Sequence, residues 1–245
     1  MISQNCKKIF SLILLFLLGG CAGNIGKPTL PEASRVNLSG MQINLWSDQA
    51  VDVDRKATIG IGELLLIDPM GRKTGFIADT QSVVSEIPDS DYDQDAGIGD
   101  DTTGAPGEPV KELGVPTPGD GTYKLKVIGT GLGEYNIGMY ANSLSGEGAQ
   151  KRIKGYISGG QIQEVEISYT QAGGLTGMTK KVTFETIRQE LQSGKALNLI
   201  TNDGIFNSLI KKVDNAEEAY KRGQKNAALN ILNAFNNELE TQKGT

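Results

Sequence analysis

The 245-residue chain contains no histidine and only two cysteines. Histidine is the usual general base, the commonest metal ligand and the side chain that titrates near neutral pH. Its absence excludes Ser-His-Asp catalysis and argues against zinc and haem sites. Cys6 lies in a leader segment and Cys21 in a lipidation motif, both described below, so we expect no disulfide and no thiolate chemistry.

The chain also lacks an excess of positive charge and a large aromatic content. Its net charge is −5, which argues against nucleic acid as a partner. Aromatic residues make up 6% of the sequence, whereas glycine occurs 32 times. This composition favours many short strands and turns over a large helical core.

The first apolar run has the features of an export signal. Lys7 and Lys8 precede residues 9–18, which are apolar apart from Ser11. Such a run is too short to span a bilayer, which needs about 20 apolar residues. The run ends in Leu18-Gly19-Gly20-Cys21, the cleavage box of bacterial lipoproteins. We therefore expect residues 1–20 to be a lipoprotein signal peptide, with an ordinary secretory leader or a buried helix as alternatives.

Lipidation of Cys21 is the consequence of this motif. One acyl chain anchors a protein only marginally, so we expect a diacylglycerol on the sulfur and a further fatty acid, such as palmitate, on the amine. Ala22 occupies the position at which Asp would favour inner-membrane retention. We therefore expect a cell-envelope protein anchored in the outer membrane. Residues 21–40, rich in Gly, Pro, Ser and Asn, are predicted to be a flexible tether.

Residues 41–172 show the alternation of apolar and polar residues that is typical of β-strands. The alternating apolar sets are Met41, Ile43 and Leu45, then Tyr123, Leu125 and Val127, and then Tyr135, Ile137 and Met139. Turn signals separate the strands, among them Asp68-Pro69-Met70-Gly71, Asp120-Gly121 and Gly159-Gly160. Eight or nine short strands with such spacing predict a β-sandwich.

After Gly173-Gly174 the apolar period changes from two to 3.6, which predicts helices. Three apolar faces follow: Phe184, Ile187 and Leu191, then Phe206, Leu209, Ile210, Val213 and Ala216, then Ala228, Ile231, Leu232, Phe235 and Leu239. Gly223 stands where a C-terminal cap belongs, so the last two helices should form an antiparallel hairpin. The predicted fold is mainly a β-sandwich followed by a three-helix unit at residues 180–245.

Two segments resemble known families. Residues 182–245, especially Asn207-Ser208-Leu209-Ile210 and the segment from Arg222-Gly223 to Phe235, resemble the FIMAH domain, a helical module of secreted and surface proteins of bacteria. Members of that family generally continue past the position of Gly244 into one more helix, which this sequence does not include. The resemblance therefore implies a less covered groove beside Phe206, Leu209 and Phe235, which we expect to meet the sandwich, a second copy or a partner's helix. Residues 63–72, together with Lys111-Glu112-Leu113 and Gly121-Thr122-Tyr123 later in the chain, resemble a β-module of the same kind of extracellular protein.

Alternating aspartates form the one metal-like pattern. Between residues 89 and 109 the chain has six aspartates and no basic residue, which predicts a solvated loop. Hard oxygen ligands at alternate positions suit calcium. The sequence thus suggests a weak calcium site, the only cofactor it points to, whose ligands would be Asp89, Asp91, Asp93, Asp95 and Asp100.

These features predict a non-enzymatic surface lipoprotein that binds protein or glycan in the envelope. Neither resembled family brings catalytic residues to transfer. Two alternatives stay open from the sequence. One is a carboxylate-dependent hydrolase acting on envelope polysaccharide, and the other is a purely structural spacer.

Overall fold

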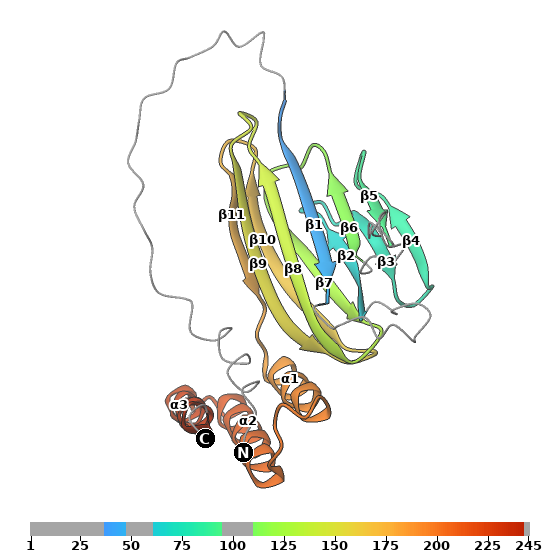
Figure 1. The fold of residues 1–245 in the computed structure, drawn as a ribbon. Coiled ribbons are helices and arrows are strands. Elements are labelled where there is room, and N and C mark those ends of the chain that lie inside the picture. The colour runs from blue at the N-terminus through green and yellow to red at the C-terminus, as the bar shows by residue number, and fades with distance from the viewer. Residues whose placement is uncertain (1–36, 48–60, 95–109, 243–245) are drawn as a thin grey trace, which may run out of the picture.

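In the computed structural model, which describes residues 37–47, 61–94 and 110–242, two antiparallel sheets stack face to face and three helices lie at one end of the stack (Figure 1). Sheet A has the strand order β5-β6-β1-β8-β9, and sheet B has the order β11-β10-β7-β2-β3-β4. The prediction of a β-sandwich followed by a helical unit is confirmed.

The strands of sheet A are β1 (Gly40–Trp46), β5 (Asp91–Asp93), β6 (Lys111–Val115), β8 (Gly133–Asn142) and β9 (Gly148–Ile157). Those of sheet B are β2 (Gly62–Ile67), β3 (Lys73–Ile77), β4 (Ser82–Ser85), β7 (Gly121–Gly129), β10 (Ile162–Thr170) and β11 (Gly174–Lys180). The helices are α1 (Phe184–Ala196), α2 (Asp203–Lys221) and α3 (Lys225–Thr241).

The core lies between the two sheets and contains the alternating apolar residues. All three alternating sets predicted from the sequence are buried there, with exposed fractions of 3% or less. Val165, Ile167 and Tyr169 of β10 and Leu64 and Leu66 of β2 complete the inner face of sheet B. Since successive side chains of a strand point to opposite faces, the residues between these apolar ones form the outer faces of the sheets.

Three local features differ from the sequence-based expectation. β11 begins at Gly174, so the sandwich continues to Lys180 and has more strands than the eight or nine expected. β5 lies inside the stretch expected to be a loop and pairs with β6. Asp120-Gly121 does not join a hairpin, because β6 belongs to sheet A and β7 to sheet B.

Local sequence signals explain where the helices begin and end. Thr183 caps α1, and its hydroxyl accepts a hydrogen bond from the Thr186 amide. Asn202 caps α2 by accepting from Gly204 and Ile205. Gly223 follows α2 with a φ of 76°, the left-handed conformation that glycine adopts most easily.

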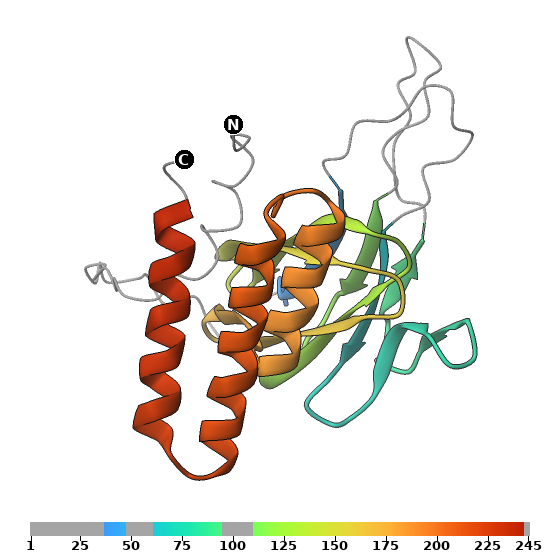
Figure 2. The same ribbon diagram turned by 90° about the horizontal axis from the view of Figure 1, so that it is seen from below.

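In the helical unit, α2 lies between α1 and α3, and α2 and α3 form the predicted antiparallel hairpin (Figure 2). None of the described helices is long and apolar enough to cross a membrane.

The helical unit docks on the sandwich through α1. The Ser193 hydroxyl of α1 lies 2.9 Å from the Ser158 hydroxyl, just after β9, and Ser193 is fully buried. Lys180 at the end of β11 forms an ion pair with Glu190 of α1, and its ammonium lies 5.7 Å from the ring centroid of Tyr135. These contacts connect the three helices to both sheets at one end of the sandwich.

Candidate functional site

The outer face of sheet A carries aromatic and amide side chains around Trp46. Gln42, Asn44 and Trp46 alternate with the buried apolar residues of β1 and therefore point outward. Cross-strand register places Asn136, Gly138 and Tyr140 of β8, and then Arg152 and Lys154 of β9, on the same face. We call the surface formed by Asn44, Trp46, Asn136, Gly138, Tyr140 and Arg152 the Trp46 face.

Trp46 is the single tryptophan of the chain and lies across the neighbouring strand. A Cβ atom added to Gly138 would be 3.0 Å from Cζ3 and 3.1 Å from Cη2 of the indole. The six-membered edge of the indole therefore lies against β8 at Gly138, where any larger residue would press on the ring. The Arg152 guanidinium carbon is 5.8 Å from the ring centroid, within the range of a cation–π contact.

Two buried amide atoms beside Trp46 have no hydrogen-bond partner among the residues that the structure describes. They are Asn44 Oδ1 and Asn136 Nδ2, and Asn136 is only 3% exposed. Asn136 is directly opposite Trp46 in the register. Asn44 and Asn136 are therefore diagonal neighbours, with Cα atoms about 7 Å apart. Unpaired buried polar atoms cost about 1–3 kcal/mol each. The pair offers one acceptor and one donor to hydroxyl groups of a ligand on this face.

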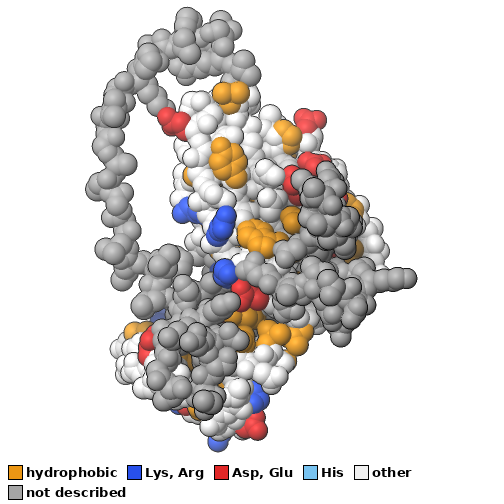
Figure 3. Space-filling model, in the orientation of Figure 1, with side chains coloured by type: hydrophobic (Ala, Val, Ile, Leu, Met, Phe, Trp, Pro, Cys, Tyr) orange, Lys and Arg blue, Asp and Glu red, His pale blue; other side chains and the backbone are white. Residues whose placement is uncertain are grey.

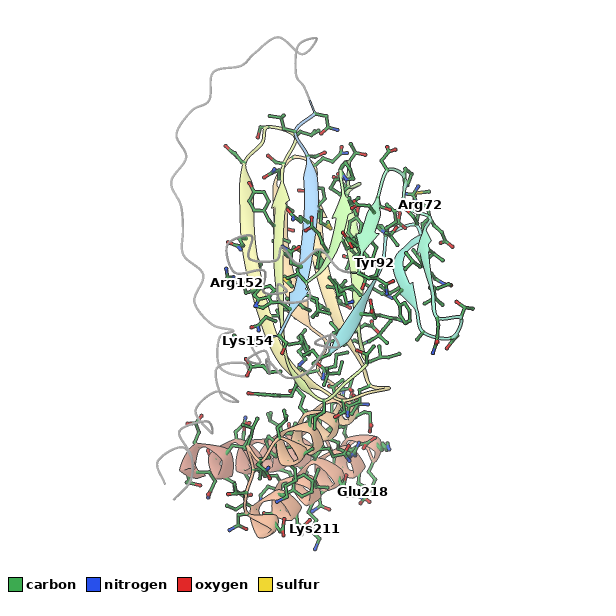
Figure 4. The ribbon with its side chains drawn as sticks, turned by 45° about the vertical axis from the view of Figure 1, so that its right-hand side comes forward. Arg72, Tyr92, Arg152, Lys154, Lys211 and Glu218 are labelled. Carbon is green, nitrogen blue, oxygen red and sulfur yellow. The ribbon has the colours of Figure 1, made fainter. Side chains whose placement is uncertain are left out.

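Charge is distributed unevenly across the Trp46 face. One register row runs from Asp93 and Glu112 through Asn44 and Gly138 to Arg152. In this row the carboxylates lie at the β5 and β6 side and the guanidinium at the β9 side. The Glu134 carboxylate of β8, two rows away on the same face, is paired with Lys154 of β9 at 3.2 Å. Figure 3 shows Lys and Arg side chains beside hydrophobic ones over β8 and β9. Figure 4 labels Arg152 and Lys154 of β9.

The outer face of sheet B has a different character. Lys126 of β7 is opposite Glu164 of β10, and Lys124 is opposite Glu166. Opposite charges placed across two strands make an ordinary solvated surface. The contrast identifies the outer face of sheet A as the candidate binding surface of the sandwich.

A buried polar cluster lies at the other side of the sandwich, where Figure 4 labels Tyr92. The Tyr92 hydroxyl donates to Glu63 Oε2 and accepts from the Leu64 amide at 3.0 Å. Lys111 Nζ lies 3.4 Å from Glu63 Oε1. Burial raises the pKa of Tyr92 well above its ordinary value, and the hydrogen bond to Glu63 raises it further. The cluster joins β2 of sheet B to β5 and β6 of sheet A, so its role is to hold the two sheets together.

The structure describes three of the five predicted calcium ligands. Asp91 and Asp93 are the outward residues of β5, and Asp89 precedes that strand with a φ of 58°. Within the described parts of the chain, no three carboxylates come together as a metal site. Asp95 and Asp100 lie outside the described residues, so calcium binding stays a prediction.

The three predicted partner-binding residues lie in the core of the helical unit. Leu209 is fully buried, Phe235 is 3% exposed, and Phe206 packs partly buried against them. Leu209 and Phe235 therefore do not line an open groove, because α2 and α3 bury them against each other. Cys21, the signal peptide and most of the predicted tether lie outside the described residues.

No family model, no curated protein and no solved structure matches the chain. The candidate site therefore depends on its own geometry. The sequence did contain a signal for it, because Trp46 is the only tryptophan and stands at an outward position of an alternating strand. The contacts with Gly138 and Arg152 could not be found that way, since they depend on the register of three strands.

Proposed function

We propose that this chain is a lipid-anchored, non-enzymatic protein of the bacterial cell envelope whose Trp46 face binds glycan. The observation that carries the proposal is the indole of Trp46 lying against Gly138. Beside it are the amide atoms of Asn44 and Asn136 that have no partner in the described part of the chain. Sugar rings present C–H groups on their faces and hydroxyl groups around their edges. The C–H groups pack on the electron-rich face of an aromatic ring, and the hydroxyl groups form hydrogen bonds with amide side chains.

The rest of the chain supports this assignment. The lipobox ending at Cys21 predicts export and anchoring, with the outer membrane favoured by Ala22. The resemblance of residues 182–245 to FIMAH domains is consistent with a surface protein. The Trp46 face supplies a stacking ring, amides and a cation, which are groups that hold a ligand.

The test uses the fluorescence of Trp46, which reports on the site without a label because the chain has one tryptophan. The full-length chain in detergent is titrated with a panel of defined oligosaccharides, both neutral and uronic. Binding should change the emission and give a saturable curve. Trp46→Ala, measured by calorimetry, should weaken binding at least about tenfold, as expected for an aromatic anchor.

Two variants control the experiment. Gly138→Leu keeps the tryptophan but fills the space that the indole occupies, so it should also lose binding. Tyr220→Ala removes an aromatic ring that is 54% exposed on α2, away from the face, and should bind normally. Normal binding by Trp46→Ala, or no binding of any oligosaccharide, would reject the proposal. Shortening of the oligosaccharide during incubation would favour the hydrolase instead.

A further inference from the structure

We infer that the glycan bound by the Trp46 face is anionic and that Arg152 binds its carboxylate. The inference rests on the proposed function and adds the chemical class of the ligand. Its starting point is the position of Arg152, which is opposite Gly138 in the register and therefore next to the part of β8 that Trp46 covers.

Arg152 is exposed, and its guanidinium N–H groups are able to bind the carboxylate of a ligand. Its guanidinium carbon lies 5.8 Å from the Trp46 ring centroid, and in the described parts of the chain Arg152 forms no salt bridge. Lys154, two residues further along β9, is paired with Glu134 at 3.2 Å. A guanidinium binds a carboxylate through two parallel hydrogen bonds, a planar geometry that an ammonium does not offer.

The charge order across sheet A also favours an acidic ligand in one orientation. Asp93 and Glu112 are in the same register row as Arg152, three to four strands away, at a strand spacing of about 4.8 Å. A carboxylate on the ligand is repelled at that side and attracted at the β9 side. A uronic acid stacked on Trp46 can place its hydroxyl groups at Asn44 and Asn136 and its carboxylate at Arg152.

The test compares matched acidic and neutral sugars on the full-length chain in detergent. Hexamers of galacturonate, mannuronate, guluronate and glucuronate are titrated beside their methyl esters, which have the same backbone without the charge. At least one acid should bind about tenfold more tightly than its ester at 50 mM salt. Raising the salt to 500 mM should reduce this preference, because the paired charges are near the surface.

Variants of Arg152 separate this inference from the proposed function. Arg152→Gln should remove the preference for the acid, so that the acid and its ester bind with the same affinity. Arg152→Lys should restore only part of it, because the ammonium lacks the bidentate geometry. Lys124→Gln removes one exposed positive charge from sheet B and serves as the control, which should behave as wild type.

Three results would overturn the inference. They are equal binding of acids and esters, an unchanged preference in Arg152→Gln, and binding of neutral sugars with no binding of any uronate. In each case the proposed function survives if Trp46→Ala still weakens glycan binding at least about tenfold. Dextran sulfate is included as a further probe, and binding of it without binding of any uronate would contradict the assignment to a carboxylate. Failure of every glycan would reject both proposals together.

Discussion

Replacing Tyr92 by phenylalanine should lower the free energy of unfolding by about 2–5 kcal/mol. The change removes one oxygen atom that serves two buried groups, the Leu64 amide at 3.0 Å and a carboxylate oxygen of Glu63. Leu64 is fully buried and Glu63 is 9% exposed, so water cannot freely replace the lost partner. Each buried group left unpaired costs about 1–3 kcal/mol, and a charged group costs more.

The assay is equilibrium unfolding in urea at pH 7, followed by circular dichroism. Tyr220→Phe is the matched control, because its hydroxyl belongs to a side chain that is 54% exposed and its loss should change stability by less than about 0.5 kcal/mol. In a double-mutant cycle, Glu63→Gln together with Tyr92→Phe should lose less than the sum of the single changes. A loss below about 0.5 kcal/mol for Tyr92→Phe would refute the reasoning.

The same hydroxyl predicts how stability depends on pH. Burial and Glu63 raise the pKa of Tyr92, so the folded chain keeps this proton at a pH where the unfolded chain has lost it. The folded state then binds more protons, and stability should fall as the pH rises above about 10, the ordinary tyrosine value. Burial also raises the pKa of Tyr123 to about 12, which adds to the effect. Tyr92→Phe should make the alkaline loss less steep, and an unchanged slope would contradict this account.

Three further predictions concern the anchor, the metal and the helical core. Cys21→Ser should leave unprocessed precursor without lipid label on a gel shift, and full processing with normal labelling would disprove anchoring. Calcium at 10 mM, with a Kd of about 10⁻⁴ to 10⁻³ M, should stabilise the chain by about 1–3 kcal/mol and raise Tm by a few degrees, whereas an unchanged Tm in calorimetry would dismiss the site. Phe235→Ala should cost about 3–5 kcal/mol in urea unfolding because the ring is buried, while Leu229→Ala on the exposed side of α3 should cost little. If Phe235→Ala instead lost self-association and kept its stability, the result would favour the open groove expected from the sequence.

Alternation and helical period were sufficient to predict the layers of this fold, because each apolar set has a single buried face to occupy. Tyr123, Leu125 and Val127 illustrate this, since all three point into the core as their spacing predicted. β11 was not predicted because its sequence contains two glycines and little apolar alternation. Its strand conformation comes from pairing with β10.

The candidate site required information that no local pattern contains. Trp46 stood out only by its rarity, and its neighbours on β8 and β9 lie about 90 to 106 residues later in the chain. Asp91 and Asp93 show the opposite case, in which a local pattern suggested a solvated loop. Tyr92 between them is drawn inward to Glu63, and this long-range contact makes the segment a strand.

The two ends of β9 fix how far the helices stand from the start of the fold. Gly148 of β9 pairs with Asn142, which also pairs with Gly40 at the beginning of β1, whereas Ser158 after β9 contacts α1 (Figure 1). Ten residues of extended strand separate these points, a span of about 30 Å. If the chain is anchored at Cys21, the helical unit lies at the end of the sandwich opposite to the end where the described fold begins. The length of the sandwich then adds to that of the predicted tether in setting the greatest distance that the helical unit reaches from the membrane.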